Sequence, residues 1–313
     1  FKQLYKDGYA KYVDMPVNWC EELGTVLSND EVIDGKSERG GYPVIRKNMK
    51  QLCIDQAAFA ERLLEGLNEI DWPESTKEMQ RNWIGRSTGV EVQFEIVGGG
   101  KFSIFTTCIE TIYGITFMVL APDGDLVQEL MPRIKNQDEV KAYIQETVSK
   151  SEMDRTELNK GKTGCRLEGI KAINPVNGRE VEVFIGDFVL ANYGTGAVMA
   201  VPSHDQRDFE YAIAHNIDRI QVIEGRDVSE HAFEKQDYLG KGCKLINSEE
   251  FTGLTVEEAK VAITKKLVDM GIAKETVNYR FREWIFARQR YWGEPVPIVH
   301  LEDGTDYVLP DEE

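Results

Sequence analysis

The chain has 313 residues, of which 42% are hydrophobic and 29% are charged, as in soluble globular proteins with one large domain or two modest ones. No apolar run approaches the length of a membrane span, which favours a cytoplasmic protein without a membrane partner. The net charge of −17 argues against a nucleic-acid partner, because phosphate contacts need cations, although four arginines gather within residues 280–290.

The first third of the chain predicts helices on either side of a β-ribbon. Residues 2–12 and roughly 52–69 have the apolar spacing of amphipathic helices. Turn-forming residues lie between them at 34–36 and 40–43, and they predict a short β-ribbon over residues 16–48. This texture differs from that of the following residues, so we expect two lobes.

From about Val90 the pattern changes to many short strands. Helices are expected at 137–150, at 206–214 after the capping residue Asp205, and at 255–270 after Thr255. Short strands with interspersed helices predict an α+β fold, with a closed or nearly closed β-barrel decorated by helices. The predicted strands are 90–96, 102–107 (joined to the first by a glycine hairpin at 98–100), 115–120, 166–173, 180–185, 188–192 and 197–201.

Three threonines lie where the second of these strands ends, namely Thr106, Thr107 and Thr111. Hydroxyl groups at such a strand end can bind the polar atoms of a substrate. The alternative is that threonine is simply a favourable strand residue. Composition alone leaves both interpretations open.

Two further polar clusters follow. The glycines of Tyr193-Gly194-Thr195-Gly196 let the backbone approach a ligand, or merely make a turn. Residues 203–208 follow an apolar strand and begin a helix. The unpaired N–H groups at such a helix start can bind a ligand. The alternative is that Asp205 serves only as the helix cap. Neither a metal site nor a catalytic dyad is expected of His204 and Asp205, because chain neighbours rarely point at one position.

Taken together and in order, these clusters resemble the bacterial-type leucyl-tRNA synthetases along essentially the whole chain. Residues 194–202 and 204–209 resemble the pocket of the editing domain that is inserted into the catalytic domain of this family. Residues 17–20, 23–27 and 80–87 resemble the catalytic-domain strip before the insertion, and 288–295 the strip after it. Glu294-Pro295 favours the leucyl enzyme over the isoleucyl and valyl enzymes.

The resemblance implies three segments: a flanking catalytic-domain segment (1–86), an editing domain (87–277) and a return segment (278–313). It implies hydrolysis of the ester bond of misacylated tRNA(Leu), which is post-transfer proofreading, in a parent enzyme that ligates leucine to tRNA. The expected partners are the acceptor end of tRNA(Leu), aminoacyl-adenosine and the rest of the synthetase catalytic domain.

The resemblance also implies which cofactors to expect. Editing needs none, whereas the parent enzyme uses ATP and magnesium. The ATP-binding motifs of the family, His-x-Gly-His and Lys-Met-Ser-Lys-Ser, do not occur in this sequence, so the chain is not expected to aminoacylate. The zinc-binding cysteines of some relatives are missing around residues 16–48 and after Val299, so no metal is expected.

By the same resemblance, Asp208 pairs with the α-ammonium group of the substrate, and Thr106 and Thr107 hydrogen-bond the ester, the ribose or the attacking water. Thr111 excludes the leucyl side chain, because a β-branched side chain makes a firm wall. No side chain is an obvious general base, which favours a positioned water, assisted by the ribose hydroxyl. The substrate-binding set is Thr111, Tyr193, Gly194, Thr195, Gly196, Met199, Val201, His204, Asp205 and Arg207.

One departure from the family pattern concerns the threonine-rich loop. In the usual Thr-Thr-Arg-Pro-Asp-Thr pattern, the central Arg, Pro and Asp are replaced here by Cys108, Ile109 and Glu110. The replacement of the arginine removes a cation that meets the acceptor end of the tRNA. Editing is then weaker, differently tuned or supported by Arg207. The alternatives are a non-catalytic module that docks the tRNA acceptor end, and the editing domain of the isoleucyl or valyl enzyme.

Overall fold

The computed structural model describes residues 1–148, 150, 155, 163–191, 195–281, 283–286, 293 and 295–312. The chain divides into two compact units: unit 1 contains Phe1–Arg86 and Tyr279–Glu313, and unit 2 contains Ser87–Asn278. The sequence-based boundary lay after residue 277, whereas Asn278 is the last residue of a strand of unit 2. Among the described residues, no helix is long and apolar enough to cross a membrane.

Unit 1 is organised around an antiparallel sheet with the strand order β13-β5-β1-β2. Its long strands, β1 (Ala10–Cys20) and β5 (Ile45–Ile54), pair continuously from Ala10 opposite Ile54 to Trp19 opposite Ile45. The expected ribbon over residues 16–48 is therefore part of a longer ribbon. The other strands of the unit are short: β2 (Thr25–Leu27), β3 (Val32–Ile33), β4 (Lys36–Ser37), β13 (Trp284–Ile285), β14 (Ile298–His300) and β15 (Asp306–Val308).

The predicted helix over residues 2–12 is wrong beyond Lys6. Helix α1 covers only Lys2–Lys6, and Gly8, with a φ of 80°, lies in the turn that leads to β1. The predicted helix over 52–69 is likewise wrong at its start, because residues up to Ile54 belong to β5. In both places the helical spacing of apolar residues is overridden by the pairing of two distant strands, which a local pattern does not contain.

Short helices follow β5 in unit 1. They are the 3₁₀ helix η2 (Ala57–Phe59) and the α-helices α2 (Ala60–Gly66) and α3 (Glu74–Ile84); a further 3₁₀ turn, η1 (Asn29–Glu31), lies within the ribbon. The sequence analysis did not predict α3. Its limits have local causes, since Pro73 precedes it, Glu74 places a negative charge in its first turn and Gly85, with a φ of 61°, ends it.

Unit 2 is a mixed sheet whose two ends approach each other. The strand order is β11-β8-β10-β9-β6-β12, and β7 pairs with β6 and also lies against β11. Strands β8 and β10 are parallel, and the other pairs are antiparallel. The predicted α+β fold with a barrel-like sheet is therefore confirmed. The strands are β6 (Ser87–Ile96), β7 (Lys101–Thr106), β8 (Phe117–Leu120), β9 (Gly164–Ile173), β10 (Glu180–Gly186), β11 (Ala197–Ala200) and β12 (Ala273–Asn278).

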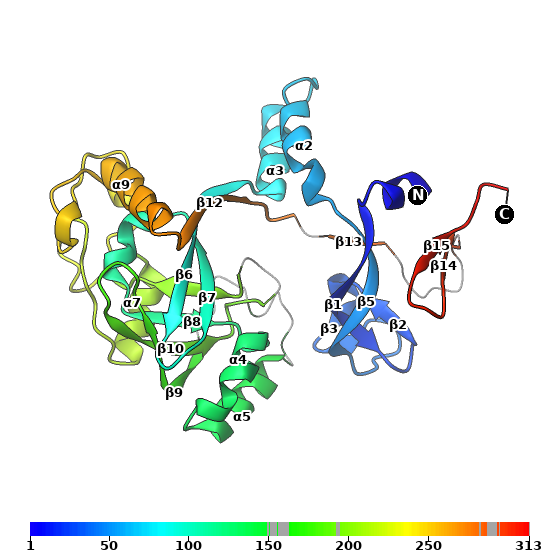
Figure 1. Cartoon of the computed structure of the whole chain (residues 1–313), viewed down its shortest axis with the longest axis horizontal. Coiled ribbons are helices and arrows are strands. Elements are labelled where there is room, and N and C mark those ends of the chain that lie inside the picture. The colour runs from blue at the N-terminus through cyan, green and yellow to red at the C-terminus, as the bar shows by residue number, and fades with distance from the viewer. Residues whose placement is uncertain are drawn as a thin grey trace. The chain divides into compact units, whose positions relative to one another are not determined.

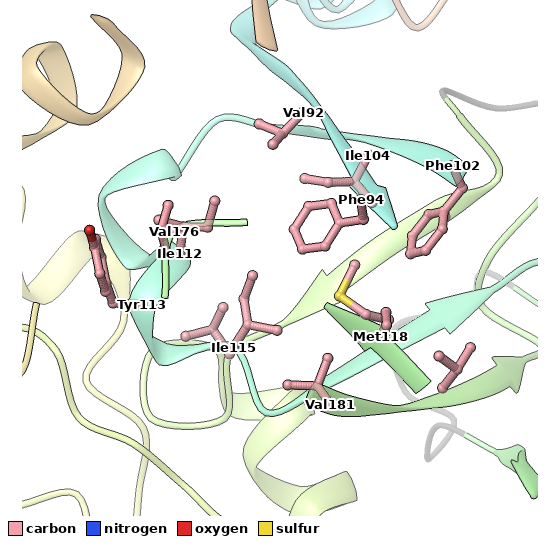
Figure 2. Close-up of a cluster of buried hydrophobic side chains, with 14 of the residues drawn as sticks. Val92, Phe94, Phe102, Ile104, Ile112, Tyr113, Ile115, Met118, Val176 and Val181 are labelled. Carbon is pink, nitrogen blue, oxygen red and sulfur yellow. The ribbon is translucent and has the colours of Figure 1, made fainter. Parts of the chain in front are cut away.

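Apolar side chains fill the inside of this barrel (Figure 2). Phe94 of β6 and Phe102 of β7 stack with their ring centroids 5.7 Å apart, and Met118 and Val181 belong to the same buried cluster from β8 and β10. Alternate residues of β7 are buried, which is the period-2 pattern of a strand with one face in a core. This packing holds β7 and β11, whose ends carry the polar clusters, in one sheet.

Helices cover the barrel, and Figure 1 places α9 and the pair α4 and α5 on opposite sides of it. The predicted helices at 137–150, 206–214 and 255–270 are confirmed, and so is the cap Thr255, whose Oγ1 accepts the Glu258 N–H at 3.3 Å. The helices of unit 2 are α4 (Asp125–Leu130), α5 (Gln137–Val148), α7 (Gln206–Ala214), α8 (Lys235–Tyr238) and α9 (Val256–Asp269), with the 3₁₀ turns η3 (Ile109–Gly114), η4 (Met131–Arg133) and η5 (Glu249–Phe251).

The predicted strand over 188–192 is wrong for residues 188–191, which are turn and irregular structure; residue 192 lies outside the described residues. Val189 is buried in a second apolar cluster with Phe117 and Phe184. Its carbonyl oxygen accepts from Arg155 Nη2 at 2.8 Å, so a side chain rather than a neighbouring strand satisfies it. The apolar run is buried because a loop folds over the sheet.

Candidate functional site

The threonine loop, Thr106–Thr111, begins at the last residue of β7. Gly89 of the adjacent strand leaves room for it, since a Cβ there would lie 2.3 Å from Thr106 O. The Cys108 N–H donates to Thr106 Oγ1 at 3.0 Å, and Thr111 Oγ1 donates to Cys108 O at 2.9 Å. Two threonine hydroxyls therefore hold the main chain of Cys108, and the Thr106 hydroxyl, an acceptor in its bond, keeps its proton to donate.

The two residues after Cys108 point into the domain. Ile109 and Glu110 are fully buried in η3, and the Tyr238 hydroxyl donates to Glu110 Oε1 at 3.2 Å. Glu110 Oε2 has no hydrogen-bond partner among the described residues. Burial raises the pKa of Glu110 above its usual value, although a main-chain hydrogen bond and the charge of Lys260 oppose the rise. The two substituted residues, Ile109 and Glu110, therefore pack into the domain and help to hold the loop in place.

Replacing Glu110 with glutamine should stabilise the protein at alkaline pH relative to the wild type. Because the pKa of this carboxyl is raised in the folded state, folding favours its protonated form, and stability is lost as pH rises from the unfolded pKa through the folded one. Glutamine has a similar shape and does not ionise. Urea unfolding at pH 4.5 and pH 8 measures the effect; a Glu110→Gln advantage that does not grow with pH contradicts it.

The second cluster, the strand–helix turn Val201–Asp208, links β11 to α7. Asp205 caps the helix as predicted, because its Oδ1 accepts the N–H groups of Arg207 at 2.9 Å and Asp208 at 3.1 Å. The Asp208 carboxylate is 8% exposed, and its Oδ2 accepts the Val201 N–H at 2.9 Å. A negative charge is therefore held at the end of β11 by the main chain.

His204 organises this turn. It is buried, its Nε2 accepts the Val222 N–H at 3.0 Å, and its Nδ1 lies 3.0 Å from Phe233 O. Since a carbonyl oxygen only accepts, Nδ1 carries the proton and the ring is neutral. Burial lowers the pKa of His204 to about 4, with the hydrogen bond to Phe233 opposing the shift. Both ring nitrogens bind main chain, so the ring fixes the turn.

The neutral state of His204 predicts acid sensitivity. The folded pKa of about 4 lies below the usual histidine pKa of 6.5, so stability is full above pH 6.5 and is lost as pH falls toward 4. Between pH 7.5 and pH 5 the wild type should lose about 2 kcal/mol more unfolding free energy than His204→Gln, which does not titrate. Urea unfolding at both pH values gives the difference; equal losses in the two proteins would rule out this cause.

The end of η3, which continues the threonine loop, packs against the start of the strand–helix turn. A Cβ on Gly114, at the end of η3, would lie 3.0 Å from Val201 Cγ1, so the two segments pack without space between them. The Thr116 N–H donates to Ala200 O at 3.3 Å. Figure 2 shows Ile112 and Ile115, which flank this part of η3 in the sequence, in the apolar core. The segment that follows the threonine loop therefore packs against the segment that begins the strand–helix turn.

The other predicted site residues have varied positions. Thr195 is exposed, and its hydroxyl donates to Ala197 O at 3.2 Å. Gly196 has a φ of 67°, the left-handed region that favours glycine. Met199 is half-buried against the core, and the exposed Arg207 lies 3.6 Å from Asp205 Oδ2. Tyr193 and Gly194 lie outside the described residues.

Two lysines reach the threonine loop from α8 and α9. Lys235 Nζ lies 3.4 Å from Thr107 Oγ1, and Lys260 Nζ donates to Thr107 O at 3.0 Å. The sequence analysis did not identify them. They are 128 and 153 residues away from Thr107 along the chain, and no local motif marks either one.

Unit 1 has a feature of its own, an apolar groove of about 770 Å³ between α2 and α3. None of the predicted site residues lines it. Over the described part of the chain, no group of three or more His, Cys, Asp and Glu side chains is placed to hold a metal ion. The groove is lined by Gln56, Phe59, Arg62, Leu63, Gly66, Leu67, Ile70, Trp72, Gln80, Ile84 and Phe281.

Comparison with known proteins gives this barrel and its site a class, the editing domains of aminoacyl-tRNA synthetases. The family described as "Leucyl-tRNA synthetase, editing domain" matches residues 81–268, so the chain belongs to the leucyl-tRNA synthetase editing-domain family. It is also similar to the LeuRS of Agrobacterium radiobacter K84 agnB2 in a ternary complex with tRNA and LeuAMS, with 30% sequence identity and a TM-score of 0.77. The match covers 100% of this chain and 35% of that protein.

Proposed function

We propose that this chain hydrolyses the ester bond of misacylated tRNA(Leu). The observation that carries the proposal is the packing of η3, which continues the threonine loop, against Val201 at the start of the strand–helix turn, in a member of this editing-domain family. The similar LeuRS is in complex with tRNA and LeuAMS, which supports the tRNA(Leu) acceptor end and aminoacyl-adenosine as ligands. A hydrolytic site is needed because a hydrophobic pocket separates side chains that differ by one methylene only about 10-fold to 200-fold.

Asp208 binds the α-ammonium group of the aminoacyl ester. Its carboxylate is buried and oriented by the Val201 N–H. The carboxylate is therefore already ordered when the substrate binds, and binding loses less conformational entropy. A charge-assisted hydrogen bond is roughly twice as strong as a neutral one. This contact fixes the ester carbonyl relative to the threonine loop.

Thr106 and Thr107 act on the ester itself. Thr106 accepts the Cys108 N–H and has its own proton for a substrate oxygen. A hydroxyl aimed at the carbonyl oxygen stabilises the negative charge that develops there as water attacks. The water is positioned by these hydroxyls and by the ribose hydroxyl, and the step needs no cofactor.

Thr111 is the residue that spares correctly charged tRNA. It is 2% exposed, and its hydroxyl is committed to Cys108 O, which fixes χ1 and leaves the methyl group as a wall. A leucyl side chain meets that wall, whereas a linear or smaller side chain passes it.

For the parent enzyme we propose ligation of leucine to tRNA(Leu) with ATP and magnesium, and the rest of its catalytic domain as the partner of unit 1. The two family motifs for ATP do not occur in these 313 residues. The present chain therefore carries the proofreading step without the ligation step.

The deciding experiment is a deacylation assay with tRNA(Leu) charged with norvaline, beside tRNA(Leu) charged with leucine. The expected result is hydrolysis of the norvalyl ester well above the spontaneous rate, with the leucyl ester left intact. Binding of the tRNA without turnover would instead identify a docking module. Preferential hydrolysis of mischarged isoleucine or valine tRNA would assign the domain to one of the sister enzymes.

A further inference from the structure

Two ammonium groups converge on one residue of the threonine loop. Lys235, the first residue of α8, approaches the Thr107 hydroxyl at 3.4 Å, and Lys260 of α9 holds the Thr107 carbonyl oxygen at 3.0 Å. Both contacts are partly buried, so solvent screens them less than contacts at an open surface.

The contact from Lys235 sets the polarity of the Thr107 hydroxyl. An ammonium group has three donors and no acceptor, so Thr107 Oγ1 uses a lone pair in this contact and keeps its proton. Among the described residues, Cys108 Sγ also lies close to Oγ1, at 3.6 Å, and a thiol sulfur is a weak acceptor. The hydroxyl is therefore prepared to donate to a better acceptor, such as the carbonyl oxygen of an ester.

The contact from Lys260 fixes the main chain at the same residue. Thr107 directly precedes Cys108, whose N–H and carbonyl are held by Thr106 and Thr111. Lys260, which lies outside the loop, adds a third hydrogen bond to the loop main chain. Burial raises the pKa of Glu110, and the positive charge of Lys260 opposes that rise. Thr107 is thus restrained at its carbonyl group and at its side chain.

We propose that Lys235 and Lys260 are positioning residues for the hydrolysis: they fix Thr107 so that its hydroxyl donates to the ester carbonyl oxygen. The inference rests on the proposed function and deepens it. Each lysine acts through Thr107, Lys235 on its hydroxyl and Lys260 on its carbonyl oxygen.

The test is a double-mutant cycle on the 313-residue chain with norvalyl-tRNA(Leu). Lys235→Met should lower kcat about 10-fold with KM changed less than twofold, and Lys235→Arg should recover most of the loss. In a Thr107→Val background, which has no hydroxyl, Lys235→Met should cause no further loss. A full additional loss in that background overturns the role of Lys235. A rise in KM that is largest at low salt and shrinks as salt increases would mean that the lysine binds tRNA phosphates directly, and it overturns the role too.

Lys260 is tested beside Lys265, an exposed lysine of the same helix that pairs with Asp269. Lys260→Met should lower kcat about 10-fold and speed amide hydrogen exchange of the peptide that covers residues 105–112, whereas Lys265→Met should do neither. Unchanged exchange and activity in Lys260→Met overturn its role. An inactive wild type overturns the proposed function and this inference together, whereas an active wild type matched by both lysine variants overturns only the inference.

Discussion

Replacing Asp208 with asparagine should lower kcat/KM for norvalyl-tRNA(Leu) roughly 30-fold to 4,000-fold and leave the fold intact. Asparagine keeps an oxygen that accepts the Val201 N–H, so the end of β11 stays in place. The negative charge is lost, and truncating one partner of a buried charge pair costs about 2–5 kcal/mol, where each 1.4 kcal/mol is a factor of ten. Deacylation kinetics with urea unfolding of the same samples measure both expectations.

Two comparisons sharpen this experiment. Asp208→Ala also removes the acceptor of the Val201 N–H, so it should lose activity and roughly 1–3 kcal/mol of stability. Glu210→Gln makes the same change of charge on the exposed face of α7 and should have wild-type activity. If Asp208→Asn hydrolyses the substrate within threefold of the wild type, the ammonium does not bind at this carboxylate.

Thr111→Ala should turn correctly charged leucyl-tRNA(Leu) into a substrate. Removing the methyl and hydroxyl groups opens the wall, and a change of this size in a pocket alters discrimination roughly 10-fold to 200-fold. The rate for norvalyl-tRNA(Leu) should fall less, because Asp208 and the Thr106 and Thr107 hydroxyls remain. The measurement is the ratio of the two deacylation rates for wild type and variant.

The control is Thr111→Val, which keeps the branched shape and loses the bond to Cys108 O. It should still reject the leucyl ester, whereas Thr111→Ser, which keeps the bond without the methyl group, should accept it. If valine admits leucine as readily as alanine does, the hydroxyl rather than the steric wall carries the selectivity. If none of the three variants cleaves leucyl-tRNA(Leu), Thr111 is not the discriminating residue.

The parts of this protein that follow from neighbouring residues were predictable. Asp205 and Thr255 were expected as helix caps, and each accepts N–H groups of its own first turn. The strands over 90–96 and 102–107 with glycines at 98–100 predicted a hairpin, and β6 and β7 form it. Such features need only a few consecutive residues, so the sequence contains the whole signal.

The parts that depend on distant contacts were not predictable in the same way. The spacing of residues 2–12 suits a helix, but residues 10–12 belong to β1 and pair with β5. His204 was predicted to contact the substrate, whereas both of its ring nitrogens bind the main chain. The partners, Val222 and Phe233, lie in later loops that no local pattern connects to His204. Lys235 and Lys260 meet Thr107 only because α8 and α9 fold back onto the loop.

The way in which Cys108 is held has a consequence for how such a site changes over time. Its main-chain N–H and carbonyl are fixed by the hydroxyls of Thr106 and Thr111, so the backbone there does not rely on the side chain at 108. That side chain is half-exposed. A substitution at position 108 therefore changes the side chain next to Thr107 while the hydrogen bonds that hold the main chain remain, so we expect this loop to tolerate sequence change at that position without losing its conformation.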